Sequence, residues 1–451
     1  MLLILIPVTL LFIIILVPSI PRIGGEPRAG LLIAGITAAF LGGLGFGGLI
    51  QASIFGIDKI AWVIMLSLFG SIYAESQVEL GTMDTVLNTF RALFGKSPRG
   101  LVAAVILTLT LAGSLLGDAI AAATVIGVLV VMGLYEIGLK GEQIGNIILM
   151  GAILGSVMPP ITQAFFLSAS LVGLESPDPL IKVGYFTVGV GVVVAILAAW
   201  RYIKIKQLPE ELIPKKSAVQ IIAEKWYTLV PLAILVTIVV LASGFKYNIF
   251  KEWSFFVSIN NVLGKIPIIK GMTFRVVEAL IVVLLISFVF PQVNRKAGKV
   301  ITEGLRKVSK TVQIQLCAGV MIGAFYKAGL IDMVKTFAEN LGATTMKLGG
   351  GFATILVGML TGSQTTAQTT IITFIGPALK TLEVDPVKAA LGAGHLAMAG
   401  QSMPPVGLTA FVVVGIVGGI INEKVDPVKV MLLTLPVTIY FAISGFIAWF
   451  I

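Results

Sequence analysis

The sequence contains very few of the side chains from which metal sites and disulfides are built. Among 451 residues there is one cysteine, Cys317, and one histidine, His395. A single cysteine excludes a disulfide framework and any site with several thiolate ligands, and a single histidine argues against a zinc site. The ATP-binding pattern Gly-x-x-x-x-Gly-Lys-Ser/Thr does not occur either. We therefore expect no enzyme and no resident cofactor.

Charged residues are scarce as well. They make up 12% of the chain, against about 25% in soluble domains, while 57% of the residues are hydrophobic. The mean hydropathy is +1.03. At about 20 apolar residues per crossing, the chain is long enough to cross a bilayer many times. We interpret it as an all-α, polytopic membrane protein, and we attribute the net charge of +10 to its loops rather than to a nucleic-acid surface.

Apolar segments that could cross a membrane recur along the whole chain. The first, Leu2–Val17, has neither a basic start nor a small-residue cleavage site, so we interpret it as a span rather than a signal peptide. Two longer stretches, Leu101–Leu174 and Gly349–Ile421, are apolar but interrupted by Gly, Ser, Thr and Pro-Pro. We predict about ten spans plus hairpins. The other apolar segments are Leu31–Ile50, Ile60–Ala74, Val183–Trp200, Trp226–Leu241, Val276–Phe290, Gln313–Tyr326 and Val428–Phe450.

Basic residues gather in two predicted loops. Because cytoplasmic loops are enriched in Lys and Arg, we place both loops in the cytoplasm. We expect the protein to lie in the cytoplasmic (inner) membrane. Counting spans backwards from the first loop then places the N-terminus outside. The basic residues are Arg201, Lys204, Lys206, Lys215, Lys216 and Lys225 in the first loop, and Arg295, Lys296, Lys299, Arg306, Lys307 and Lys310 in the second.

The two interrupted stretches resemble each other, which predicts an internal repeat. Three short matches keep their order, at offsets of 248, 249 and 245 residues. In the predicted topology the two units run in opposite directions, so the repeat is inverted. Inverted repeats with discontinuous helices are typical of secondary transporters, with the binding site at the repeat interface. The matches are Gly81–Val86 with Gly329–Val334, Gly113-Ser114 with Gly362-Ser363, and Gly155–Pro160 with Gly400–Pro405.

Each repeat is predicted to contain a re-entrant hairpin. Leu101–Ala112 and Ala119–Met132 are each too short to cross about 30 Å of hydrocarbon at 1.5 Å per residue, and Gly113–Asp118 can turn the chain between them. The alternative is a pair of ordinary spans with tight loops, which would break the charge pattern. The second hairpin is predicted from Gly351–Leu360 and Thr369–Leu379, joined at Thr361–Gln368.

Each repeat also contains a Pro-Pro pair inside an apolar run, at Pro159-Pro160 and Pro404-Pro405. Two successive prolines remove two N–H donors and disfavour helix before them, so the helix is expected to open there. Opened backbone at membrane depth must be buried in protein or face a polar cavity. A simple proline kink is the alternative at either site, but the pairing of each break with a Gly-Ser tip favours binding.

These parts predict ligands for a cation and an anion. Opened carbonyls and hydroxyls are oxygen ligands for sodium, and helix N-termini attract an anionic substrate. For any one hydroxyl, a bond to its own helix is the simpler role. We predict sodium ligands, through backbone or hydroxyl groups, among Gly113, Ser114, Gly117, Asp118, Ser156, Met158, Gly362, Ser363, Thr366, Gly400, Ser402 and Met403. We predict substrate contacts at Ser114, Thr162, Gln163, Ser363, Gln364, Thr365 and Thr409.

Two titratable residues, Asp118 and His395, lie close to the predicted tips and breaks. Asp118 is a carboxylate at predicted membrane depth, where charge is costly, so it is a candidate to bind sodium, carry a proton or cap the following helix. His395 precedes the second break and titrates near neutral pH in water, although a lone histidine more often serves as a hydrogen-bonded packing residue. No Lys or Arg is predicted within the repeat cores, so sodium and helix ends would have to balance an anionic substrate.

The second repeat resembles a known family. The runs Asp385-Pro386-Val387 and Met403–Phe411 are similar to the large membrane subunit of the tripartite ATP-independent periplasmic (TRAP) transporters, within the ion transporter superfamily. The Gly113–Gly127 hairpin and the Pro159-Pro160 break agree in layout. Near the first tip the family commonly reads Gly-x-Ser-Gly-Ser, whereas this chain reads Gly113-Ser114-Leu115-Leu116-Gly117-Asp118.

The resemblance implies an elevator-type, sodium-coupled carrier of small organic acids such as C4-dicarboxylates. It also implies two partners, a small four-helix membrane subunit and a periplasmic substrate-binding protein. The alternative is a cation/proton antiporter of the same superfamily that uses Asp118. We divide the chain into scaffold helices (1–76), the first transport unit (77–174), scaffold helices with cytoplasmic loops (175–312), the second transport unit (313–422) and a C-terminal helix (423–451).

Overall fold

The computed structural model describes residues 2–17, 19–244 and 247–451. Within these ranges every regular element is a helix, as the apolar composition predicts. Six of the described helices are long and apolar enough to cross a membrane, and the number rises to eight if two bent pairs each form one span. The prediction of about ten spans is higher because several other apolar helices have only 10–17 residues.

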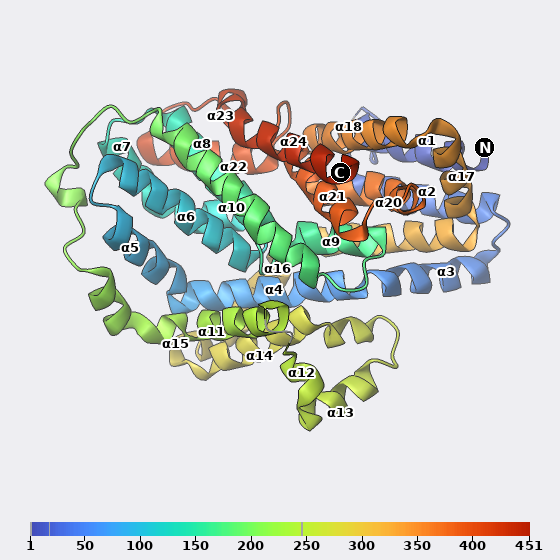
Figure 1. The fold of residues 1–451 in the computed structure, drawn as a ribbon, viewed down its shortest axis with the longest axis horizontal. Helices are drawn as coiled ribbons and strands as arrows, with labels where there is room; N and C mark the ends of the chain where they lie inside the picture. Colours follow the sequence, from blue (N-terminus) through green and yellow to red (C-terminus); the bar gives the residue numbers. More distant parts are fainter. Residues whose placement is uncertain (1, 18, 245–246) are drawn as a thin grey trace.

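The helices form two bodies, each packed mainly within itself (Figure 1). We name the first the α16 body, because its long helix α16 packs against α2, α3 and α4. Helix α14 packs against α4, and α11 packs against α5 and α14. The α16 body comprises α1 (Leu2–Leu16), α2 (Pro27–Leu41), α3 (Phe46–Lys59), α4 (Ala61–Leu80), α11 (Ala218–Gly244), α14 (Arg275–Val289) and α16 (Ala297–Lys327).

We name the second the hairpin body, because it contains both predicted hairpins. Its tightest contacts join α6 to α8 and α21 to α24. The hairpin body comprises α6 (Pro98–Leu116), α7 (Ala119–Glu136), α8 (Gly141–Val157), α9 (Gln163–Val172), α10 (Asp178–Trp200), α18 (Ala343–Thr361), α19 (Gln364–Ala367), the π-helical turn η3 (Gln368–Ile372), α20 (Thr373–Thr381), α21 (Pro386–Gln401), α22 (Leu408–Ile421), α23 (Pro427–Leu433) and α24 (Leu435–Phe450).

Short helices connect the two bodies or pack on their surfaces. Helix α5 (Thr82–Phe94) packs against α6 of one body and α11 of the other, and α17 (Leu330–Leu341) packs mainly against α20. Helices α12 and α13 form a projection from the α16 body (Figure 1), and aromatic residues in it, including Phe255, are exposed. The remaining short elements are η1 (Glu210–Leu212), α12 (Ile249–Glu252), α13 (Ser254–Leu263), η2 (Ile269–Thr273) and α15 (Pro291–Asn294).

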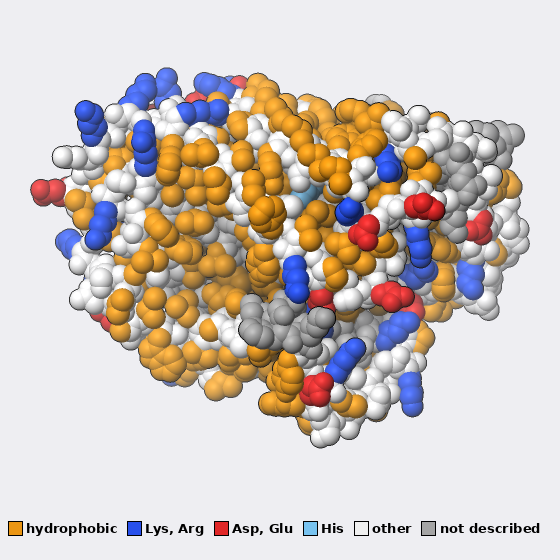
Figure 2. Space-filling view, viewed as in Figure 1, with side chains coloured by type: hydrophobic (Ala, Val, Ile, Leu, Met, Phe, Trp, Pro, Cys, Tyr) orange, Lys and Arg blue, Asp and Glu red, His pale blue; other side chains and the backbone are white. Residues whose placement is uncertain are grey.

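Hydrophobic side chains cover the middle of the face shown in Figure 2, and charged side chains gather toward its two ends. Helices that cross this middle zone expose large apolar residues, such as Phe186 at 74% and Leu285 at 63%. An apolar belt between charged ends is the surface that a bilayer requires. The arrangement is that of a multi-pass membrane protein.

The two halves of the hairpin body repeat each other at the tips and at the helix breaks. Gly117 and Gly362 both have left-handed backbones, with φ of 65° and 61°, and each ends the first helix of a hairpin. The peptide bonds Pro159-Pro160 and Pro404-Pro405 are both cis. One offset, 245 residues, relates these pairs. The two hairpins approach each other tip to tip from opposite ends of the molecule in Figure 1, as an inverted repeat requires.

The predicted turns of the hairpins, Gly113–Asp118 and Thr361–Gln368, contain the observed turns but are too long. Helices α6 and α7 have 19 and 18 residues, and only Gly117 and Asp118 separate them. Gly113 lies inside α6, where an added Cβ would come within 2.7 Å of the Gly155 Cα atom on α8. It therefore corresponds to Gly358, which packs against Gly400 in the same way, and not to Gly362.

Three further predictions need correction. The predicted span Leu31–Ile50 divides into α2 and α3 because the chain between them, Gly42–Gly45, is rich in glycine. The second basic loop is mostly helix, since α16 begins at Ala297 and runs for 31 residues. The predicted span Val428–Phe450 is bent by 56° between α23 and α24.

Candidate functional site

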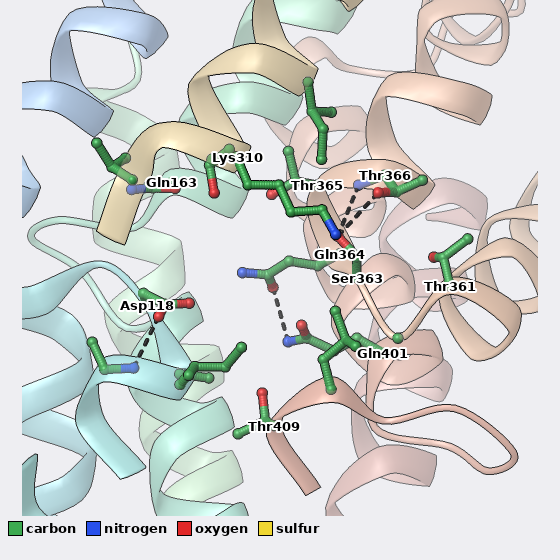
Figure 3. A pocket seen from close by; sticks show the side chains of 18 of the residues that line it. Asp118, Gln163, Lys310, Thr361, Ser363, Gln364, Thr365, Thr366, Gln401 and Thr409 are labelled. Atoms are coloured by element: carbon green, nitrogen blue, oxygen red, sulfur yellow. Dashed lines mark hydrogen bonds between the residues drawn. The ribbon is translucent and has the colours of Figure 1, made fainter. Parts of the chain in front are cut away.

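The tips of the two hairpins line one cavity of about 710 Å³ (Figure 3). Gly117 and Asp118 contribute the first tip, and the segment Thr361–Thr366 contributes the second. The third wall comes from α16, which belongs to the other body. The cavity therefore lies where both repeat units and both bodies meet.

The first tip presents a carboxylate at a helix N-terminus. Asp118 is exposed in the cavity, and its Oδ2 atom accepts a hydrogen bond of 2.9 Å from the Ala121 N–H, which caps α7. The sharp turn before it requires the left-handed backbone of Gly117. The predicted capping role of Asp118 is thus present in the structure, together with access to the cavity.

The second tip presents hydroxyl and amide groups. The Ser363 hydroxyl oxygen accepts hydrogen bonds from the backbone N–H of Thr366 at 3.2 Å and from its hydroxyl at 3.1 Å. These bonds cap α19, which continues through η3 into α20 without a break. Below them in Figure 3, the Gln401 amide donates to the Gln364 side-chain oxygen at 3.1 Å. Ser363 therefore occupies the place that Asp118 has in the first repeat.

Some of the predicted ligands line this cavity and others lie outside it. The cavity includes Gly117, Asp118, Gln163, Gly362, Ser363, Gln364, Thr365, Thr366 and Thr409. The predicted residues that do not line it are Gly113, Ser114, Ser156, Met158, Thr162, Gly400, Ser402 and Met403.

Among the residues outside the cavity, the hydroxyls have other partners. Ser114 donates to the Pro159 carbonyl at 2.6 Å, which ties the first hairpin to the first helix break. Ser156 and Ser402 each donate to a carbonyl in their own helix, at 2.8 and 2.9 Å, and Thr162 caps α9. These side chains hold the breaks in shape. Their role as ligands remains a prediction.

Comparison with known proteins identifies the family. The family model described as "Tripartite ATP-independent periplasmic transporter, DctM component" matches residues 31–449. The chain belongs to this family. TRAP systems combine this component with a small membrane subunit and a periplasmic binding protein.

Solved structures with the same fold are also transporters. The Alcanivorax borkumensis YdaH transporter is similar with a TM-score of 0.61 and 14% identity, over 99% of this chain and 95% of that one. Neisseria gonorrhoeae MtrF, described within a class of antimetabolite efflux pumps, has a TM-score of 0.55 and 12% identity, over 98% and 94% of the two chains. No curated protein matches the sequence. These likenesses show a shared fold, and membership of the DctM family makes the chain a secondary transporter.

In the DctM fold, two basic residues of the predicted second loop line the cavity instead. Lys307 and Lys310 line the cavity from α16, outside the repeat cores, so sodium and helix ends are not the only positive groups beside the tips. Lys307 forms an ion pair with Glu75 of α4, within the α16 body. The spacing of the two lysines could have predicted their common position, because residues three apart in a helix share one face.

His395 of this DctM chain is buried away from the cavity. Its two ring nitrogens lie 3.2 Å from the Thr187 hydroxyl and 3.0 Å from the Ser444 hydroxyl. Its ring packs between Phe165 and Phe441. With both nitrogens hydrogen-bonded and no exposed surface, His395 joins α10, α21 and α24 as a packing residue.

Proposed function

We propose that the chain carries a small organic acid into the cell by coupling its movement to sodium, through an elevator mechanism. The observation that supports this proposal most strongly is the meeting of two capped hairpin tips in one cavity. Each tip ends a helix and begins another, so each supplies free carbonyl groups and free N–H groups close together. A cation and an anion can therefore bind side by side.

In this proposal the sodium ions bind at the tips. Asp118 supplies a carboxylate in the first tip, and Ser363 and Thr366 supply hydroxyls in the second. Helices α6 and α18 are capped at their C-termini by Gly117 and Gly362. The last carbonyls of each helix have no helical partners and can bind a cation. All these ligands are oxygen atoms, which suit a hard cation.

The organic acid would lie between the tips. The N-termini of α7 and of the continuous helix that starts with α19 both face the cavity and favour negative charge. Gln364, Gln401 and Thr409 add neutral polar groups to the wall. These groups can orient a carboxylate without requiring a compensating buried charge from the hairpin body itself.

The packing of the two bodies suits an elevator. Each body is dense inside, whereas α4 and α16 meet the hairpin body through few residues. Polar links between the bodies include the ion pair of Asp178 with Arg275 and the bond of 3.1 Å from the Ser170 hydroxyl to the Lys59 carbonyl. Breaking a few such contacts would free the hairpin body to move as a unit, with α5 and α17 as its connecting arms.

We further propose an orientation with the N-terminus outside and the basic ends of α11 and α16 in the cytoplasm. The cavity is lined by Lys307, Lys310 and the Gly24-Gly25 turn, which belong to the cytoplasmic end in this orientation. The structure would then represent an inward-open state. As in other TRAP systems, a small membrane subunit and a periplasmic binding protein would complete the importer.

Transport by the purified chain in liposomes tests the proposal. Labelled succinate and labelled lactate, added outside with a sodium gradient directed inward, should accumulate more than with a potassium gradient of equal size. Each assay is run with and without a co-purified binding protein and small subunit. Failure of both acids to accumulate under every sodium condition would refute the proposal.

A cation/proton antiporter is the second candidate, and Asp118 is the observation in its favour. The second repeat has a serine at the equivalent position, so this carboxylate is a charge that a sodium site built from carbonyls and hydroxyls does not need. Proton flux driven by sodium in the absence of any acid would favour the antiporter. Asp118→Asn should abolish that flux, whereas acid uptake by an importer would survive in part.

A further inference from the structure

The cavity has an unequal distribution of fixed charge between its walls. Four formally charged side chains line it: Glu75, Asp118, Lys307 and Lys310. Glu75 and Lys307 neutralise each other as an ion pair across α4 and α16. Among the described residues, neither Asp118 nor Lys310 has an ion-pair partner. Lys307 lies within electrostatic range of Asp118, and Glu26, which pairs with Arg28, lies within electrostatic range of Lys310. Asp118 and Lys310 are nevertheless the two charged side chains of the lining that form no ion pair among the described residues, so Asp118 can bind a cation and Lys310 an anion.

Lys310 is placed to act on a molecule at the second tip. Its side chain is exposed and extends from α16 toward Ser363 and Thr366 in Figure 3. The second tip holds the N-terminus of the helix that starts with α19, so an anion there meets a helix end on one side and an ammonium group on the other. A carboxylate bound by both groups is stabilised more than by either group alone.

Lys310 and the tip belong to different bodies. Helix α16 packs against α2, α3 and α4, whereas Ser363 and Thr366 are part of the hairpin body. If the hairpin body carries the substrate along the α16 body, Lys310 does not travel with it. The distance between Lys310 and the tip therefore depends on the position of the hairpin body.

We propose that Lys310 binds the substrate carboxylate from the α16 body, and that this contact exists only in the arrangement of the two bodies seen here. The inference rests on the proposed function, which it deepens by assigning a carboxylate ligand. It predicts an affinity that differs between the two sides of the membrane. In the proposed inward-open orientation, Lys310 raises affinity on the cytoplasmic side alone.

Membrane vesicles of the two orientations test this inference with the complete chain and its partner subunits. Right-side-out vesicles present the outer face to the added acid, and inside-out vesicles present the cytoplasmic face. The probe is whichever of labelled succinate and labelled lactate the wild type transports. The variants are Lys310→Gln, Lys310→Arg and, as the matched control, Lys299→Gln, whose lysine lies on the same helix outside the cavity and pairs with Glu79.

For Lys310→Gln we expect the half-saturating acid concentration to rise about tenfold in inside-out vesicles, as loss of one charged hydrogen bond predicts. In right-side-out vesicles it should stay within about twofold of the wild type. Lys310→Arg should restore most of the affinity, and Lys299→Gln should behave as the wild type on both sides.

Two results would overturn the inference while leaving acid transport in place. One is an equal rise for Lys310→Gln in both vesicle orientations, and the other is no rise in either. If the wild type transports neither acid in either orientation, the proposed function fails and the inference fails with it. Normal amounts of Lys310→Gln protein in the membrane separate a binding defect from a folding defect.

Discussion

The close contact of α6 with α8 makes a quantitative prediction at Gly155. An added Cβ there would lie 2.6 Å from the Gly113 Cα atom and 2.8 Å from the Thr110 carbonyl oxygen. Carbon atoms pack at about 3.5–4.0 Å, so the two helices would have to separate by roughly 1 Å. Both obstructing atoms are backbone, which cannot rotate away. The contact at Gly155 is therefore one that no side chain can occupy without moving a helix.

The expected cost of Gly155→Ala follows from three contributions. Overpacking of this kind costs about 1–3 kcal/mol. Separation of the helices would also weaken the bond from Ser114 to the Pro159 carbonyl, worth about 1 kcal/mol. Alanine recovers about 0.5–1 kcal/mol through its better helix propensity. The net destabilisation is about 1–3 kcal/mol, and transport should fall because the first tip is displaced.

Thermal unfolding of the detergent-solubilised chain measures this effect against a matched control. An added Cβ at Gly189, in the middle of α10, would meet nothing within 4 Å. Gly189→Ala should therefore leave stability unchanged or raise it by up to about 1 kcal/mol. A Gly155→Ala protein that unfolds at the same temperature as Gly189→Ala and transports normally would refute this account of the helix contact.

Three further predictions concern the two tips and the loop before α2. Asp118→Asn keeps a capping side chain but removes the charge, so the half-saturating sodium concentration for transport should rise about tenfold, measured as sodium-dependent uptake. The double variant Ser363→Ala/Thr366→Ala removes two oxygen ligands, and unchanged sodium affinity in the same assay would show that the second tip is wrongly assigned. Arg28 holds the pKa of Glu26 below its usual value through a hydrogen bond and an ion pair. This contact therefore stabilises the fold fully at pH values above the unfolded pKa of Glu26. Its contribution is lost as the pH falls through the lowered pKa of the folded state. Glu26→Gln should accordingly lower stability by less than about 1 kcal/mol at neutral pH and make no difference near pH 3, as followed by unfolding temperatures at the two pH values.

Local sequence signals were sufficient for the repeat and for the general place of the site. Two prolines in succession cannot continue a helix, so Pro159-Pro160 and Pro404-Pro405 locate the breaks without knowledge of their neighbours. The glycine before Ser363 similarly locates the second tip, whereas the first repeat offers both Gly113-Ser114 and Gly117-Asp118 and only the second of these is the tip. These positions can be recognised from the sequence because proline and glycine determine the conformation of their own backbone.

Features that depend on distant contacts could not be predicted in this way. Gly113 resembles a turn residue in the sequence, but it is needed because Gly155 crosses it on another helix. Lys310 resembles a loop residue because it lies in a run of basic residues, and only the length of α16 brings it to the cavity. A glycine used for packing and a glycine used for turning look alike until the opposite helix is known.

We propose that sodium and the acid bind together in the cavity between the tips. Two ligands that share a site in this way must each raise the affinity for the other by the same factor. Calorimetric titration of the purified chain with the transported acid, in sodium and in potassium buffers of equal ionic strength, measures that factor directly. We predict a dissociation constant at least about tenfold lower in sodium, and a loss of this difference in Asp118→Asn. Equal dissociation constants in the two buffers would contradict the claim.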